Sequence, residues 1–323
     1  MTKKTILISL LCTAAIVCTG GYFFYISLPS ASPAAYELFN TDLVPVTEFP
    51  PRNEFYEITE GVLLYEISLK ETDGYYDTPG RGGKFWLYLP AGNHAKDSLA
   101  CVLIAGAGST LLTGMNLSEG DQPEHIQYVR NGYAVLAYEI DGLMDGLNIK
   151  PAYTAFHGSM GGLINARNAM EYILTKVPEV NPDFIFTAGH SSAGTMALVF
   201  AEHEPRLAGC IAYAPCHNVM KRFNDMVGIR GLSLFLPGLV DFSIKISPET
   251  HESNISCPVF LFHSVDDQQT EFDGSKAAAI RLVALGKNVT FVTADSYGHY
   301  ESMLYEGIPK GIQWLNSICF DTQ

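Results

Sequence analysis

The sequence predicts an α/β protein with a mostly parallel central sheet and helices on both faces. Helix-length segments alternate with apolar runs of strand length, which lie near residues 100–105, 133–138, 184–189, 209–214, 257–262 and 289–294. Such alternation is typical of parallel strands joined by covering helices. Two further observations support this prediction: a glycine-framed serine follows one of these runs, and an acid and a histidine follow two later ones.

Two earlier strands and one helix complete the expected framework. Residues 62–69 and 84–89 are expected to form an antiparallel pair, joined by a glycine-rich turn region at residues 80–83. Residues 163–177 place their apolar side chains on one helical face and are expected to form a helix.

Ser191 stands between a strand-like run and a helix-like run, in the sequence Gly189-His190-Ser191-Ser192-Ala193. A sharp strand-to-helix turn exposes a nucleophile, and it needs small residues two positions before and after the serine. Gly189 and Ala193 meet this need. The similar stretch 158–162 follows no clear strand and is expected to be a loop and helix start, so Ser191 is the predicted nucleophile.

Carboxylates and a histidine follow two later strands. Asp266 and Asp267 come just after the apolar run that ends at His263, and His299 follows the run 289–294. Because the carboxyl ends of parallel strands meet at one edge of a sheet, these side chains are expected to lie near Ser191. The chain order is serine, acid, histidine, which is the order of the α/β-hydrolase fold.

From about Glu57 to Trp314 the chain resembles the α/β-hydrolase superfamily of serine hydrolases, especially its prolyl-oligopeptidase-type and dienelactone-hydrolase-like branches. The residues that carry the resemblance are 189–194, 258–267 and 298–299. In such families the second strand usually ends in His-Gly-x-x-Asp, so counting from His263 favours Asp267 as the acid, although Asp266 stays an alternative. Ser264 replaces the usual glycine.

The resemblance also implies an oxyanion hole in the loop after the strand at 100–105. Relatives often have His-Gly-Gly there, so Ala105 and Ala107 are departures. Backbone N–H groups are sufficient to stabilise an oxyanion. By position, the expected donors are the N–H groups of Ala107 and Ser192.

The long interval 215–256 lies where this fold commonly carries an inserted lid. It contains the apolar run 231–240, which is expected to cover an acyl pocket. Helices packed against the sheet are an equally supported alternative.

The N-terminal residues predict a membrane anchor. Residues 5–28 are uncharged and mostly apolar, long enough to span a bilayer, and no clean cleavage site follows them. We expect residues 1–4 to be a cytoplasmic tail, 5–28 a transmembrane signal anchor, 29–55 a linker and 56–323 the α/β-hydrolase domain. The domain would face the extracytoplasmic side; export after signal cleavage is the alternative.

Charge and motifs exclude several classes of partner. The net charge of −14 argues against nucleic acid and anionic lipid surfaces. The sequence has no glycine-rich phosphate loop, Cys-x-x-Cys pair or His-Glu-x-x-His motif. We therefore expect no cofactor and no metal, and a small-molecule acyl substrate. The oligomeric state is left open.

The expected function is hydrolysis of a carboxylic ester through a Ser-Asp-His triad and an acyl-enzyme. One alternative is a serine peptidase or aminoacyl amidase of prolyl-oligopeptidase type that lacks the propeller domain. The apolar insertion and the absence of room for a propeller favour the ester. A second alternative is a non-catalytic binding protein with the hydrolase fold, for which the Ala105, Ala107 and Ser264 departures leave room.

Overall fold

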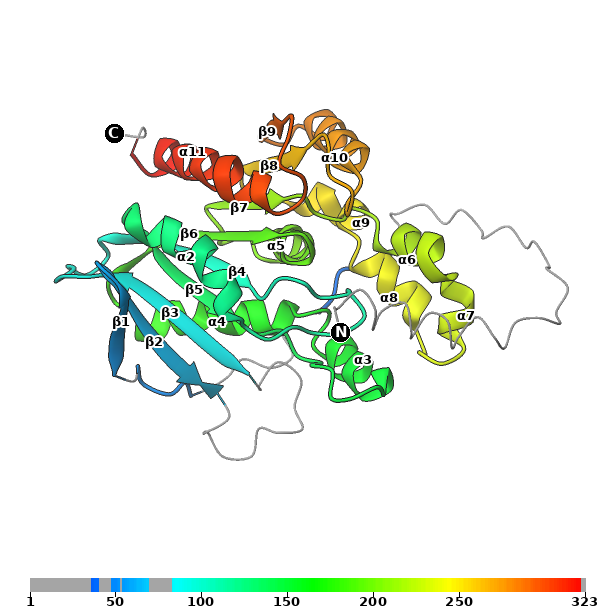
Figure 1. The fold of residues 1–323 in the computed structure, drawn as a ribbon, viewed down its shortest axis with the longest axis horizontal. Helices are drawn as coiled ribbons and strands as arrows, with labels where there is room; N and C mark the ends of the chain where they lie inside the picture. The colour runs from blue at the N-terminus through cyan, green and yellow to red at the C-terminus, as the bar shows by residue number, and fades with distance from the viewer. Residues whose placement is uncertain (1–35, 41–47, 53, 70–82, 321–323) are drawn as a thin grey trace, which may run out of the picture.

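A nine-stranded mixed sheet forms the centre of this computed structural model, which describes residues 36–40, 48–52, 54–69 and 83–320. Its strand order is β1-β2-β3-β5-β4-β6-β7-β8-β9 (Figure 1). The strands β1, β2, β3 and β5 pair antiparallel, and β5, β4, β6, β7, β8 and β9 pair parallel. Their bounds are β1 Phe55–Thr59, β2 Val62–Ser68, β3 Lys84–Pro90, β4 Leu99–Ala105, β5 Ala134–Tyr138, β6 Val180–His190, β7 Gly209–Tyr213, β8 Val259–Ser264 and β9 Val289–Ala294.

The predicted sheet is confirmed. Each expected strand forms, and the antiparallel pair of residues 62–69 and 84–89 is β2 with β3. Its expected turn region, 80–83, lies outside the described residues except for Gly83. The edge strand β1 was not expected, because its residues are exposed or half-buried and show no apolar run.

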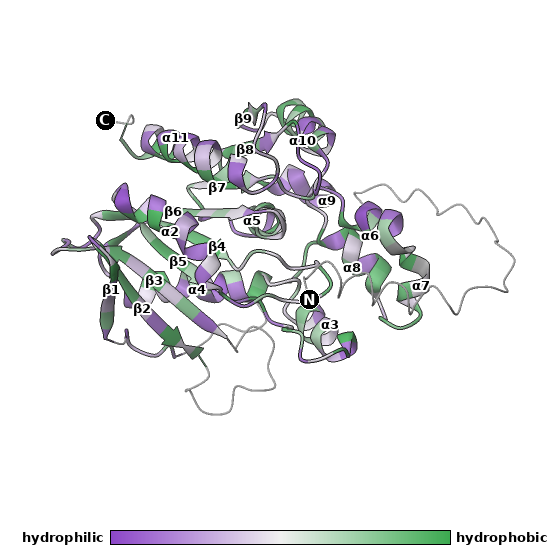
Figure 2. Ribbon diagram, in the orientation of Figure 1, coloured by the Kyte–Doolittle hydropathy of each residue, from purple (hydrophilic) through white to green (hydrophobic). Residues whose placement is uncertain are grey.

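Helices cover both faces of the sheet, as expected. In β4, Cys101 and Leu103 pack into one core and Val102 and Ile104 into the other, because successive side chains of a strand point to opposite faces. The first core takes residues from α4, α5 and α10, and the second from α2 and α11. The outer helices α10 and α11 carry both hydrophobic and hydrophilic residues (Figure 2).

The helices of the core have the following bounds: α2 Gln122–Arg130, α4 Leu163–Lys176, α5 Ser192–His203, α10 Phe272–Ala284 and α11 Ile308–Phe320. The helix expected at 163–177 is therefore confirmed as α4. Between β5 and α4 lies α3 (Ile149–Gly158), and short turns of helix occur at Glu119–Asp121 and Met303–Gly307.

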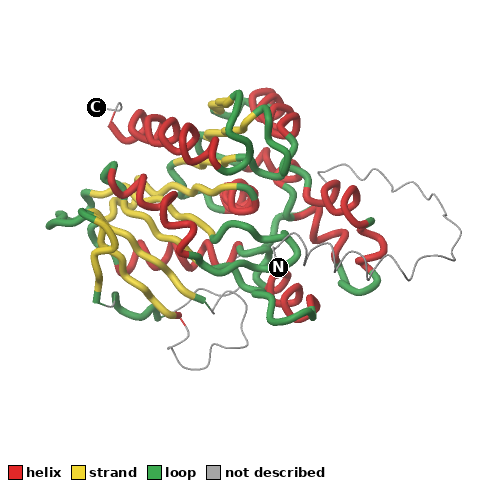
Figure 3. The backbone as a smooth tube through the Cα atoms, viewed as in Figure 1, coloured by secondary structure: helices red, strands yellow, loops and turns green. Residues whose placement is uncertain are grey.

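The insertion 215–256 folds into short helices, of which α6, α7 and α8 project from one end of the body (Figures 1 and 3). Their bounds are α6 Val219–Val227, α7 Ile229–Ser233, α8 Leu239–Lys245 and α9 Pro248–His251, followed by a 3-10 turn at Glu252–Asn254. Within the apolar run 231–240, Leu236 and Leu239 are buried, whereas Leu234 and Phe235 are 83% and 73% exposed. Since part of the run faces solvent, its role as a lid stays a prediction.

Part of the predicted linker packs onto the body. Phe39 contacts the rings of His203 and Phe242, and Phe49 is buried in the first core. The expected tail and anchor, residues 1–4 and 5–28, lie outside the described residues, and the anchor stays a prediction. Within the described ranges, no helix has the length and apolar character needed to cross a bilayer.

Candidate active site

Ser191 lies on the turn between β6 and α5, with φ 58° and ψ −119°. A non-glycine residue rarely adopts this conformation, which costs on the order of 1–3 kcal/mol. The N–H of Ser191 donates to the carbonyl of Tyr213, 2.8 Å away, and holds the turn against β7. A Cβ on Gly189 would lie 2.3 Å from the carbonyl carbon of Ala193. The glycine two positions before the serine is thus required by the close approach of strand and helix.

The second glycine-framed serine, Ser159, has a structural position. It is the C-cap of α3, and its hydroxyl is fully buried and donates to the carbonyl of Phe156 at 3.0 Å. No strand precedes it, as expected, and the stretch leads into the start of α4; the helix α3 before it was not expected.

Asp267 and His299 meet at the carboxyl edge of the sheet, in the loops after β8 and β9. Asp267 Oδ2 lies 2.6 Å from His299 Nδ1, and the Asp267 side chain is fully buried. The neighbouring Asp266 turns the other way and accepts hydrogen bonds from Ser264 Oγ and the N–H of Gly298. Of the two candidate acids, the structure brings Asp267 to His299, while Asp266 shapes the loop before it.

The hydrogen bonds around Asp267 favour its ionised form. Burial alone would raise its pKa, but hydrogen bonds from His263, from His299 and from the N–H groups of Gln269 and Thr270 outweigh burial. They hold the pKa of Asp267 well below its usual range. The ionised Asp267 accepts a hydrogen bond from the Nδ1–H of His299. This leaves His299 Nε2 as the acceptor nitrogen.

His190 connects the serine turn to the loop of His299. Its Nε2 lies 2.9 Å from the His299 carbonyl oxygen, and the two rings are 4.5 Å apart between centroids. Burial, with the nearby His299, lowers the pKa of His190 to about 3, so the ring is neutral and donates this hydrogen bond. Among the hydrogen bonds of the described residues, none joins Ser191 Oγ to His299. In substrate-free enzymes such contacts are often loose and tighten on binding.

The loop after β4 approaches the serine turn at the expected oxyanion donors. The N–H of Gly108 donates to Ser192 Oγ at 3.1 Å, which fixes the loop against the start of α5. In the part of the chain that the structure describes, no hydrogen bond occupies the N–H of Ala107 or of Ser192. Both donors are therefore available, and that of Ser192 lies in the first turn of a helix, where N–H groups lack helical partners.

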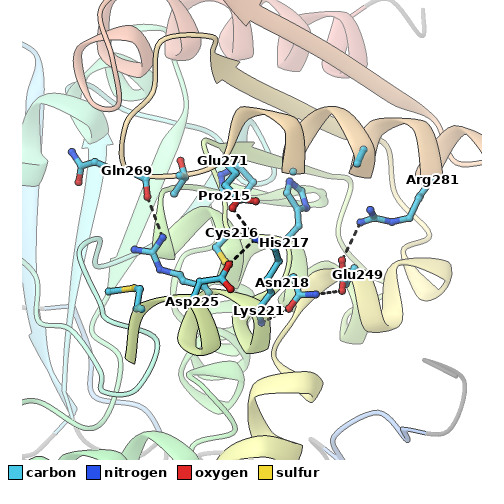
Figure 4. A pocket seen from close by; sticks show the side chains of 15 residues that line it. Pro215, Cys216, His217, Asn218, Lys221, Asp225, Glu249, Gln269, Glu271 and Arg281 are labelled. Atoms are coloured by element: carbon cyan, nitrogen blue, oxygen red, sulfur yellow. Dashed lines mark hydrogen bonds and ion pairs between the residues drawn. The ribbon is translucent and has the colours of Figure 1, made fainter. Parts of the chain in front are cut away.

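A cavity of about 410 Å³ lies beside the loop that carries Asp267. It is lined by residues 215–218 after β7, by α6, by residues 269–271 and by α10 (Figure 4). Lys221 pairs with Glu271, and Arg281 lies near Glu249. Neither Ser191 nor His299 lines this cavity. No group of three or more His, Cys, Asp or Glu side chains within the described ranges is placed to hold a metal ion.

Several polar residues at the site were not singled out from the sequence. Thr270 Oγ1 donates to Asp267 Oδ2 at 2.9 Å, and His263 Nε2 lies 3.2 Å from the same oxygen. Ser275, on α10, contacts His263 Nδ1 at 2.7 Å. The position of His263, four residues before Asp267, is a signal in the sequence. Thr270 and Ser275 have no such signal, since only the folded chain brings Thr270 to Asp267 and Ser275 to His263.

Comparisons with known proteins relate the chain to esterases and peptidases. A model of the prolyl oligopeptidase family matches residues 165–308. An acetyl esterase of Xylanibacter ruminicola is 27% identical over a region that covers 43% of this chain and 37% of the esterase. The match thus spans little more than a third of that relative's length.

Two solved structures share the architecture at low identity. The acetyl xylan esterase of Paenibacillus sp. R4 has a TM-score of 0.59 and 16% identity, over 82% of this chain and 89% of its own. The acylaminoacyl peptidase of Pyrococcus horikoshii has a TM-score of 0.61 and 16% identity, over 82% of this chain and 42% of its own. At these identities the similarity shows the fold, which is the α/β-hydrolase fold.

Proposed function

We propose that this chain, a serine hydrolase of the α/β-hydrolase superfamily, cleaves carboxylic esters through Ser191, His299 and Asp267. The observation that carries the proposal is the strained serine turn, on the same sheet edge as a buried Asp267–His299 pair. A conformation of this kind, held by a glycine that tolerates no Cβ, is expected where a nucleophile must be exposed.

In the proposed reaction, His299 Nε2 takes the proton of Ser191 as the serine oxygen attacks the ester carbonyl. Asp267 stays ionised, orients the imidazole and stabilises its cationic form. The N–H groups of Ala107 and Ser192 donate to the developing oxyanion. The alcohol leaves with the proton from His299, and water then hydrolyses the acyl-enzyme with His299 again as the base.

Short acyl esters are the first substrate class that we propose, because two of the similar proteins are named as acetyl esterases. A peptidase or acylaminoacyl amidase is the second candidate, which the match to the prolyl oligopeptidase family favours. An ester and an amide with the same acyl group separate these candidates.

The test combines active-site labelling with turnover. The full chain should react with a fluorophosphonate, with the label on Ser191, and should hydrolyse p-nitrophenyl acetate. We expect Ser191→Ala to abolish both, and His299→Ala to lower turnover at least about 1000-fold. His94→Ala is the matched control, since within the described ranges the hydrogen bond of the His94 ring is to the carbonyl of Pro90, near the far end of β3.

Three other results would contradict the proposal. Turnover of an acylaminoacyl amide without turnover of the matched ester would support the peptidase instead. A label on another serine would overturn the assignment of Ser191. No label and no turnover on folded protein would favour the non-catalytic binding protein.

A further inference from the structure

We propose that His263, Ser275 and His217 form a directed hydrogen-bond chain that positions Asp267 and, through it, His299. This inference rests on the proposed function, and it makes the three residues positioning residues for the same site.

The hydrogen-bond chain is continuous, and its members are buried. His217 Nε2 lies 3.1 Å from Ser275 Oγ, and Ser275 Oγ lies 2.7 Å from His263 Nδ1. His263 Nε2 lies 3.2 Å from both Asp267 Oδ2 and Thr270 Oγ1, and Thr270 Oγ1 donates to Asp267 Oδ2 at 2.9 Å. His263 and Ser275 are fully buried, and His217 is 6% exposed. Asp267 Oδ2 is therefore held between two imidazoles, with His299 on its other side at 2.6 Å.

With neutral histidines, one arrangement of protons satisfies every contact. The carboxylate of Asp267 only accepts, so Thr270 gives its one hydroxyl proton to Asp267. His263 must then carry its proton on Nε2, where it faces Asp267 Oδ2 and Thr270 Oγ1, and its Nδ1 is an acceptor. Ser275 has a single hydroxyl proton, which must then go to His263 Nδ1. Its oxygen accepts in turn from His217 Nε2–H. Each hydrogen bond thus donates toward Asp267, and aligned chains of this kind polarise one another.

The hydrogen-bond chain also connects three separate elements of the fold to Asp267. His263 is the last but one residue of β8, Ser275 lies on α10, and His217 follows β7 and lines the 410 Å³ cavity (Figure 4). Small shifts of a catalytic group cost large factors in rate, roughly 100-fold for 1 Å. Fixing Asp267 from three elements is a means of keeping His299 aligned.

The test compares Ser275→Ala with Ser243→Ala in the full chain, with p-nitrophenyl acetate as substrate. Ser243 is a matched control, because it is a fully buried serine on α8 whose hydroxyl also makes a buried hydrogen bond. We expect Ser275→Ala to lower kcat roughly 10-fold with little change in KM. Ser243→Ala should change neither.

A second measurement does not depend on turnover. In ¹⁵N-histidine NMR of the wild-type chain, His263 and His217 should be neutral and protonated on Nε2. A His263 that is protonated on Nδ1 or on both nitrogens would overturn the inference, as would equal kinetics of the two serine variants. If the tautomers are as expected but the wild type neither reacts with a fluorophosphonate nor hydrolyses esters, the proposed function fails instead.

Discussion

Ser191 adopts a backbone conformation that a side chain disfavours, and its neighbours hold it there. Gly189 has no Cβ, and the turn requires this. A Cβ there would lie 2.3 Å from the carbonyl carbon and 2.4 Å from the carbonyl oxygen of Ala193. Neither β6 nor α5 can move away easily, because both are buried between layers. A methyl group on Gly189 would therefore prevent the close approach of β6 and α5 that holds Ser191 in its strained conformation.

Gly189→Ala is expected to lower the free energy of unfolding by about 2 kcal/mol or more, because backbone atoms cannot yield as a flexible side chain can. Urea unfolding measures this. Gly231→Ala is the control, since a Cβ there meets no atom within 4 Å and its φ is not left-handed. In a short helix that change should be neutral or slightly stabilising. Equal stability of the two variants would mean that the turn relaxes freely.

The residues that carry a local signal could be predicted, and those that act through long-range contacts could not. Ser191 stands in a motif whose chemistry requires small neighbours, and His299 and Asp267 follow strand-like runs. The sequence left Asp266 and Asp267 open, because adjacent carboxylates differ only in the direction in which the folded loop turns them. Thr270 contacts the acid from a loop, and Ser275 contacts His263 from α10, so no spacing indicates either residue.

At the scale of elements, the parallel strands were predictable because each contains an apolar run, although the edge strand β9 is only half-buried. The edge strand β1 was missed since it has no buried residue, and the insertion 215–256 was only partly predictable. In its apolar run, Leu236 is buried and Leu234 is exposed, and the sequence does not indicate which of the two leucines is buried.

The contact between the β4 loop and α5 carries a prediction at this scale. The N–H of Gly108 donates to Ser192 Oγ and holds the loop that supplies the proposed donor Ala107. The variant Ser192→Ala keeps the backbone N–H of residue 192 but removes the hydroxyl that holds the loop after β4. We expect kcat to fall roughly 10-fold, less than the 100- to 1000-fold typical for loss of a whole oxyanion donor, and KM to change little. Steady-state kinetics measures this.

Ser98→Ala is the control for Ser192→Ala, because its exposed hydroxyl donates, among the residues that the structure describes, to a nearby carbonyl before β4. If Ser192→Ala keeps the kcat of Ser98→Ala, the loop is held by other contacts and the hydrogen bond has no role in turnover.

At the scale of the whole molecule, the formal charge of −14 overstates the charge of the folded state. Burial raises the pKa of Glu202 well above its ordinary value and, with the nearby charge of Asp121, raises that of Glu124 to about 8. Glu124 Oε1 has no hydrogen-bond partner within the described ranges. The folded state thus prefers these carboxyls neutral, whereas the unfolded chain ionises them near pH 4.5.

The sign of the resulting pH dependence follows from linkage. The pKa of Glu124 is higher in the folded protein than in the unfolded chain. Its contribution to the free energy of unfolding is therefore most favourable below about pH 4.5 and is lost as the pH rises toward about 8. The glutamine in Glu124→Gln has a similar shape and stays neutral at every pH, so the variant does not lose this stability as the pH rises. The melting temperature of the variant relative to wild type should therefore rise between pH 5 and pH 8, by roughly 3 °C or more. Glu119→Gln, at an exposed position of the adjacent turn, is the matched control for the loss of one carboxyl group. If the difference for Glu124→Gln follows that of Glu119→Gln at every pH, Glu124 is ionised and hydrated in the folded protein.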